Sequence, residues 1–163
     1  MKNWYLLYCK RGEQQRAKLH LENQGVECFY PEVTFEKILR GKKQEVTEPL
    51  FPSYVFICFD FEAGPAFSTI RSTRGVIDFV RFGAQPKALD PELIEHLREV
   101  DPDQVIQSVL PQQGQVVRIK TGQFAGIDAI YQEPDGETRS ILLVNMISKP
   151  VPLSVENRDL ELG

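Results

Sequence analysis

The sequence has little of what most enzymes need. It contains two histidines and three cysteines among 163 residues. His20 and His96 lie far apart, with no carboxylate at metal-site spacing, and no zinc-protease, nucleophile-elbow or Walker motif is present. The cysteines lack CxxC spacing, which favours reduced thiols in the core of a cytoplasmic protein. We therefore expect no enzymatic activity, no cofactor and no metal.

Long hydrophobic runs are also absent. The densest apolar stretch, Tyr54 to Phe59, has the length of a strand, whereas a membrane-spanning helix needs about 18 residues. The apolar run from Trp4 to Cys9 is too short for a signal peptide and ends at two basic residues. We therefore expect a cytoplasmic chain that makes no contact with a membrane.

Neither acidic nor basic residues are in large excess, but the two kinds are unevenly distributed along the chain. The net charge is −4, yet residues 1–20 carry five basic residues and one acidic residue. Residues 101–163 carry five basic and nine acidic residues. This asymmetry indicates two modules, of which the first can meet a polyanion. Nothing in the sequence indicates a stable oligomer, so we expect a monomer.

The first 100 residues predict an α+β domain with a mainly antiparallel sheet flanked by helices. The expected strands are residues 3–9, 26–30, 33–39, 44–47, 53–59 and 76–82, and the expected helices are 12–24, 65–71 and 90–100. Both faces of the first strand are apolar, so it should be central. Residues 101–113 contain Pro102 and Pro111 and few large apolar groups, which is typical of a linker.

Residues 114–163 leave two folds open. Alternating apolar residues at 117–119, 127–131 and 141–143, separated by glycines, favour a small β-barrel. The same segment also fits two helices joined by the turn at 133–136, with apolar stripes at helical spacing. The residues alone favour the barrel over the helical hairpin.

One group of basic and polar residues is typical of a nucleic-acid surface. Arg and Lys neutralise phosphates, and Gln and His reach base edges or stack on unpaired bases. The candidates are Lys10, Arg11, Arg16, His20, Gln24, Thr73 and Arg74. Three of them recur every four residues along the expected first helix and so share one face. Arg71 and the basic tip of the hairpin at 40–43 are weaker candidates, and a plain solvated helix face is the alternative.

Three further patterns together resemble the NusG family of transcription elongation factors. Residues 114–119 followed by Gly122–Gly126 resemble the KOW motif of its C-terminal domain. Trp4-Tyr5, the run Pro49-Leu50-Phe51-Pro52-Ser53-Tyr54 and Arg74-Gly75-Val76 resemble its N-terminal NGN domain. Within the family, the chain looks most like the specialised antitermination paralogues, on residues 4–12, 48–52 and 133–137. The resemblance implies an NGN domain at 1–100, a linker at 101–113 and a KOW domain at 114–163.

The resemblance also implies partners. Such factors bind the clamp helices and the gate loop of RNA polymerase, suppress pausing and termination, and are recruited by an exposed single-stranded element of non-template DNA. The implied polymerase-binding residues are Leu50, Phe51, Tyr54, Phe56, Ser68 and Thr69. The implied DNA-binding residues are the basic and polar group already described.

For the KOW domain the resemblance implies two states. In the closed state it is an α-helical hairpin packed on the NGN domain, and on release it is a five-stranded β-barrel that recruits a small-subunit ribosomal protein. The expected lock is a Glu48–Arg139 pair, with Phe51 and Tyr54 covered by apolar residues. Those covering residues are Phe124, Ile127, Ile130 and Leu143. One alternative is a general NusG-like factor with a constitutively open barrel, and another is an RNA- or ribosome-binding module without polymerase contact.

Overall fold

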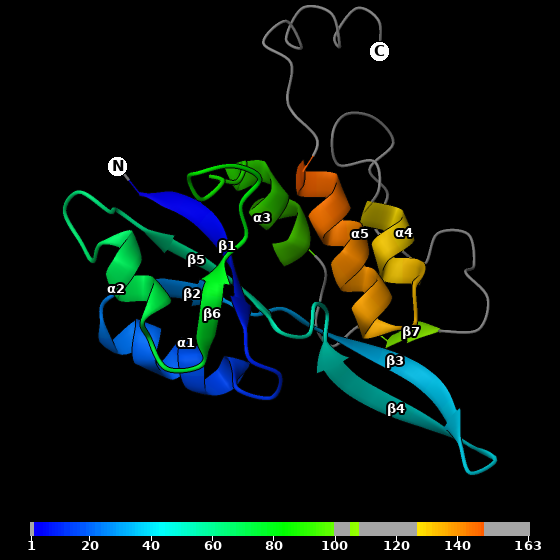
Figure 1. The fold of residues 1–163 in the computed structure, drawn as a ribbon. Coiled ribbons are helices and arrows are strands. Elements are labelled where there is room, and N and C mark those ends of the chain that lie inside the picture. Colours follow the sequence, from blue (N-terminus) through cyan, green and yellow to red (C-terminus); the bar gives the residue numbers. More distant parts are fainter. Residues whose placement is uncertain (1, 100–104, 108–126, 149–163) are drawn as a thin grey trace, which may run out of the picture. The chain divides into compact units, whose positions relative to one another are not determined.

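The structure is a computed structural model that describes residues 2–99, 105–107 and 127–148 (Figure 1). The chain divides into two compact units. The first unit comprises Met1–Pro31 and Phe51–Glu99, and the second comprises Glu32–Leu50 and Val100–Gly163. The hairpin at 32–50 therefore groups with the C-terminal part of the chain. The domain boundaries expected from the sequence stay a prediction.

The first unit is built on a four-stranded antiparallel sheet with the order β2-β5-β1-β6 (Figure 1). Its strands are β1 (Asn3–Cys9), β2 (Glu27–Phe29), β5 (Tyr54–Phe59) and β6 (Val76–Phe79). Its helices are α1 (Gln14–Asn23), α2 (Phe67–Arg71) and α3 (Pro91–Arg98). The predicted α+β fold is confirmed, and β1 is central because β5 and β6 flank it. The last strand is shorter than the expected 76–82.

Helix α1 packs on one face of this sheet. Its apolar positions Ala17 and Leu21 are fully buried against residues such as Val55 and Ile57 of β5. The helix ends before Gly25, whose φ of +85° is the left-handed conformation that favours glycine at a helix stop. This packing fixes the opposite, polar face of α1 toward solvent.

Helix α3 begins where the sequence predicts. Asp90 Oδ1 accepts a hydrogen bond from Glu92 N at 2.9 Å, and Pro91 occupies the first turn. This arrangement satisfies a backbone donor that the helix itself leaves unpaired. Within the described residues, no helix is both long enough and apolar enough to span a membrane.

The second unit contains a three-stranded sheet with the order β4-β3-β7. Strands β3 (Glu32–Leu39) and β4 (Lys42–Pro49) form the expected hairpin, whose paired strands are longer than predicted. Strand β7 (Val105–Gln107) pairs in parallel with β3. These three residues lie within the expected linker, whose bounds stay a prediction, and they add a strand to this sheet.

Helices α4 (Ile127–Gln132) and α5 (Gly136–Ser148) complete the second unit. The barrel strands that the residues favoured at 127–131 and 141–143 are wrong in this structure. One reason is the helix cap between them: Asp135 Oδ2 accepts hydrogen bonds from both the backbone N and the hydroxyl of Thr138, at 3.1 and 2.7 Å. A second reason is the buried face of α5, where Arg139, Leu143 and Ile147 recur every four residues. The KOW-like motif and Phe124 lie outside the described residues.

Candidate functional site

The predicted DNA-binding residues lie on three neighbouring segments of the first unit: the end of β1, helix α1, and the turn between α2 and β6. Lys10 N donates to Gly75 O at 2.8 Å, which ties the end of β1 to that turn. A Cβ at Gly75 would lie 2.9 Å from Glu13 O and 3.1 Å from the Ala17 Cβ, and the φ of Gly75 is +89°. Glycine therefore lets the turn approach α1 and brings Arg74 close to the start of the helix.

A side-chain hydrogen bond joins the same turn to the other end of α1. Gln24 Nε2 donates to Thr73 Oγ1 at 2.9 Å, and Thr73 Oγ1 donates to Thr69 O at 3.1 Å. Thr73 is buried. In this structure its hydroxyl therefore orients Gln24 rather than facing solvent.

Most charged members of this group are exposed to solvent. The exposed cations are Lys10, Arg11, Arg16 and Arg74, and His20 is half-buried. Arg16 Nη1 lies 3.5 Å from Glu13 Oε1 in an exposed pair, and such pairs contribute at most about 1 kcal/mol. A phosphate can therefore replace Glu13 as the partner of Arg16 at little cost.

The predicted polymerase-binding residues differ in their exposure. Leu50, Phe51 and Phe56 are fully buried, whereas the Tyr54 ring is half-buried and lies 5.1 Å, centroid to centroid, from the exposed ring of Tyr8. Ser68 and Thr69 are exposed on α2. In this state a partner therefore reaches the hydroxyls of α2 and the tyrosine pair, but not the three buried apolar side chains.

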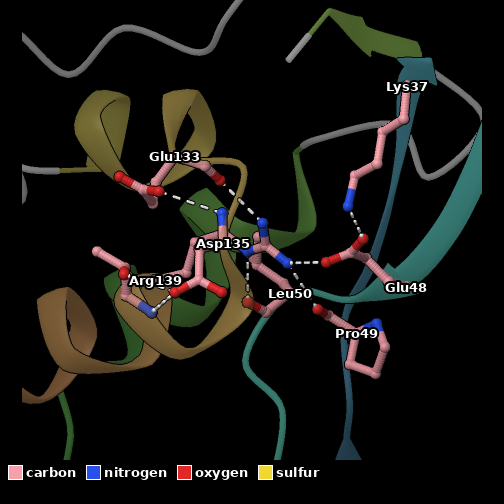
Figure 2. Close-up of polar contacts among 8 residues, drawn as sticks. Lys37, Glu48, Pro49, Leu50, Glu133, Asp135 and Arg139 are labelled. Carbon is pink, nitrogen blue, oxygen red and sulfur yellow. Dashed lines mark hydrogen bonds and ion pairs between the residues drawn. The ribbon is translucent and has the colours of Figure 1, made fainter. Parts of the chain in front are cut away.

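Within the second unit, Arg139 of helix α5 is completely buried, and its polar contacts are drawn in Figure 2. Nε of Arg139 donates to Leu50 O at 2.8 Å, and Nη1 donates to Glu133 O at 2.8 Å. Nη2 donates to Glu48 Oε2 at 2.6 Å and to Pro49 O at 3.1 Å. The guanidinium thus has charged or carbonyl acceptors at all three nitrogens, as a buried cation requires. The Glu48–Arg139 contact expected from the sequence is present.

Glu48 also holds a second cation that the sequence analysis missed. Lys37 Nζ donates to Glu48 Oε1 at 2.7 Å (Figure 2). Burial alone would raise the pKa of Glu48, but the hydrogen bonds from Lys37 and Arg139 outweigh burial and hold that pKa below its ordinary value. Lys37 Nζ and Arg139 Cζ also lie 5.6 and 4.8 Å from the ring centroid of Phe35. The register of the hairpin could have predicted this contact, because it places Lys37, Phe35 and Glu48 on one face.

Among the described residues, no three His, Cys, Asp or Glu side chains lie close enough together to hold a metal ion. The three cysteines are free and lie in β1, β2 and β5. Burial is the main cause that raises the pKa of Cys9 and of Cys28 to about 12. Both thiols are therefore protonated and unreactive at neutral pH.

The first unit is an α+β fold with exposed cations on and beside α1, and the second unit holds a buried arginine. Residues 2–98 match the family model "NusG: Transcription termination factor nusG". The chain belongs to the NusG family of transcription termination/antitermination factors, which bind RNA polymerase and are not enzymes.

Curated relatives match over nearly the whole chain. The NusG protein of Thermus thermophilus is 27% identical, with 94% of each chain covered. The NusG protein of Helicobacter pylori is also 27% identical, over 99% of this chain and 98% of the relative. The NusG protein of Bacillus subtilis is 26% identical over 95% of each. All three are named transcription termination/antitermination protein NusG.

Among solved structures, the chain is similar to one titled "Domain interaction in Thermotoga maritima NusG". The sequence identity is 22%, and the TM-score is 0.43. The match covers 76% of this chain and 75% of that chain.

Proposed function

We propose that this NusG-family chain is a specialised antitermination factor of the RfaH type. It binds the clamp helices of RNA polymerase, reads an exposed element of the non-template strand, and suppresses pausing and termination only at operons that carry the element. The observation that carries the proposal is the set of bonds from Arg139 to Glu48, Pro49 and Leu50.

These bonds connect the C-terminal helices to the segment assigned to the polymerase. Leu50 begins the apolar run that the resemblance gives to the clamp helices, and Arg139 binds its carbonyl oxygen. A factor whose polymerase-binding segment is held in this way needs a release step before it acts. Glu48 and Arg139 form the lock, with Ile127, Ile130 and Leu143 as buried apolar members of the same unit.

The Glu48–Arg139 lock can be released because a buried ion pair adds little net stability. Desolvation of two charges offsets much of their attraction, so withdrawal into water recovers part of the cost. In the released state, the alternating residues at 127–131 and 141–143 become strands of a five-stranded barrel. That barrel recruits a small-subunit ribosomal protein and couples transcription to translation.

Contacts with DNA and with the gate loop complete the proposal. Lys10, Arg11, Arg16 and Arg74 neutralise phosphates of the non-template strand. His20 and Gln24 contact its bases, with Thr73 holding Gln24 in place. The exposed hydroxyls of Ser68 and Thr69 bind the gate loop.

A general NusG-like elongation factor is the second candidate function. It is favoured by the names of the relatives, which are all NusG, and by their coverage of nearly the whole chain. In that case the KOW domain is a permanently open barrel, and binding has little sequence preference.

The test measures binding of the full chain to RNA polymerase elongation complexes halted at successive template positions. The specialised factor is captured only where one non-template sequence is exposed, and equal capture at every position indicates the general factor. The variant Arg139→Glu should widen the range of positions that capture the chain, because it breaks the lock. Tyr54→Asp should abolish capture, and unchanged activity of that variant would indicate a module that does not contact the polymerase.

A further inference from the structure

Helices α1 and α2 of the first unit are joined by a chain of two side-chain hydrogen bonds. Gln24, the residue that follows α1, donates from Nε2 to Thr73 Oγ1 at 2.9 Å. Thr73 Oγ1 in turn donates to the carbonyl oxygen of Thr69 in α2 at 3.1 Å. The chain therefore connects the surface proposed to read DNA with the helix whose exposed hydroxyls are proposed to bind the gate loop.

This chain fixes which end of the Gln24 amide faces Thr73. A hydroxyl group has one proton to donate, whereas a carbonyl oxygen can only accept. The proton of Thr73 goes to Thr69 O, so Gln24 must present its NH2 group, and not its oxygen, to Thr73. The carbonyl of Thr69 thus sets the orientation of an amide that could otherwise turn over.

The Thr73 hydroxyl is used up inside the protein. Thr73 is buried, with 8% of its surface exposed, and its single proton is already donated to Thr69 O. A nucleic acid on the α1 surface therefore receives no hydrogen bond from this hydroxyl in the arrangement seen here. The geometry is that of a positioning residue, which acts through Gln24.

The oxygen of the Gln24 amide is left unpaired by the same arrangement. Gln24 Oε1 is buried, and it has no hydrogen-bond partner among the residues that the structure describes. A buried acceptor without a donor destabilises the folded state. Unpaired bases carry N–H donors on their edges, and glutamine amides recognise such edges. A base that donates to Oε1 therefore removes this destabilisation as it binds.

We propose that the Thr69–Thr73–Gln24 chain couples recognition of an unpaired base to the position of α2. Thr73 holds the Gln24 amide so that its oxygen accepts from an N–H group of the base, and movement of the amide passes through the Thr73 hydroxyl to the carbonyl of Thr69. DNA capture and gate-loop binding are then linked in this chain. The inference rests on the proposed function for the identity of the two surfaces.

The experiment titrates the ¹⁵N-labelled full chain with short single strands of DNA that each contain one kind of base: adenine, cytosine or thymine. NMR measures the affinity for each strand from the amides of α1, and it shows whether the amides of α2 shift in the same titration. We expect unequal affinities for the three strands. We also expect shifts on α2 that saturate together with those on α1.

Two substitutions at one position isolate the hydroxyl. Thr73→Val keeps the shape of the side chain but removes the partner of Gln24. The ratio of affinities between the most and least preferred strands should fall by about fivefold, which corresponds to one net hydrogen bond, and the shifts on α2 should disappear. The shifts at Arg16 should remain, because a phosphate contact does not depend on the chain. Thr73→Ser restores the hydroxyl and should restore both the ratio and the shifts on α2.

Ser72 offers a matched control at the same carbonyl. Ser72 Oγ also donates to Thr69 O, at 3.0 Å, beside the hydroxyl of Thr73. Ser72→Ala therefore removes a hydrogen bond from the end of α2 without removing the partner of Gln24. We expect this variant to keep both the ratio of affinities and the shifts on α2.

Three results overturn the proposal. The first is equal binding of the three strands by the unsubstituted chain. The second is a Thr73→Val variant that keeps either the ratio or the shifts on α2, or a Thr73→Ser variant that restores neither. The third is a Ser72→Ala variant that loses them to the same extent as Thr73→Val. Capture by elongation complexes tests the proposed function separately, because these titrations contain no polymerase, so the two failures are distinguishable.

Discussion

The inner part of the β3–β4 hairpin (Glu32–Lys37 with Gln44–Pro49) and its tip (Ile38–Lys43) use the same kinds of residue for opposite purposes. In the inner part, Lys37 lies with Glu48 and Arg139 over the ring of the buried Phe35. At the tip, Lys42 and Lys43 of β4 are exposed. The comparison shows that burial, and not the order of charges along the strand, decides whether a cation is held inside the protein or offered to a partner.

The inner part and the tip should also differ in energy. Lys43 Nζ lies 4.0 Å from Glu36 Oε1, and 75% of the Lys43 side chain is exposed. A pair of this kind contributes between zero and about 1 kcal/mol. Arg139 is fully buried, and removing its charged partner costs about 3–5 kcal/mol. Substitutions of Glu48 or Arg139 should therefore change the fold of α4 and α5, and substitutions of Lys42 or Lys43 should not.

Reversing the charge of Arg139 is expected to have the largest effect. Arg139→Glu places a carboxylate against Glu48 and leaves three backbone carbonyls without their donor. We expect loss of helix at 127–148, from a destabilisation of about 3–5 kcal/mol. Carbon chemical shifts of these residues in the full chain measure it. The control is Glu45→Lys, at an exposed position on the opposite face of β4 from Glu48, and equal loss of helix in both variants would contradict the comparison.

Exchanging the two charges should restore the helices only in part. The double variant Glu48→Arg, Arg139→Glu rebuilds an ion pair, but the new arginine then lies beside Lys37, which already donates to residue 48. Like charges at this distance repel. Adding Lys37→Met should therefore recover more helix at 127–148, as measured by the same chemical shifts. Full recovery by the double variant alone would show that Lys37 has no influence on the lock.

Acid should unfold the helices at 127–148 by protonating the carboxylate of Glu48. The pKa of Glu48 is held below its ordinary value of 4.5, because hydrogen bonds from Lys37 and Arg139 outweigh the effect of burial. Its contribution is therefore complete above pH 4.5 and is lost as the pH falls through the lowered value. We expect helix at 127–148 to decrease below pH 4.5 by circular dichroism and chemical shifts. In Glu48→Gln this transition should disappear, and a transition that persists unchanged would assign it to other groups.

The sequence predicted the first unit well because its signals are local. The i, i+4 pair Ala17 and Leu21, the stop at Gly25 and the cap at Asp90 each depend on a few adjacent residues. The same is true of the turn at Arg40 and Gly41, which lies in the second unit. Hairpin, helices and sheet strands followed from such patterns, with errors confined to the ends of elements.

The second unit was harder for a physical reason. The buried face of α5 includes Arg139, which interrupts the apolar periodicity, so the residues alone favoured the barrel over the helical hairpin. Lys37 was missed because its partner is eleven residues away, across the hairpin. The residues alone gave the helical hairpin as the less favoured of two folds, and the resemblance to the NusG family supplied the Glu48–Arg139 contact.

The smallest expected effect comes from replacing one lysine by methionine. The same replacement can be made at Lys37 and at the tip, so the two results can be compared directly. Lys37→Met removes a second cation that binds Glu48, at Oε1 where Arg139 binds Oε2, and that also lies over the ring of Phe35. We expect the helices at 127–148 to be retained to higher urea concentration, by less than about 1 kcal/mol, because the repulsion between the two cations is gone. Lys43→Met makes the same change at the tip and should leave the urea dependence of these helices unaltered. A loss of helix in Lys37→Met would mean that the lysine supports the lock rather than competing with it.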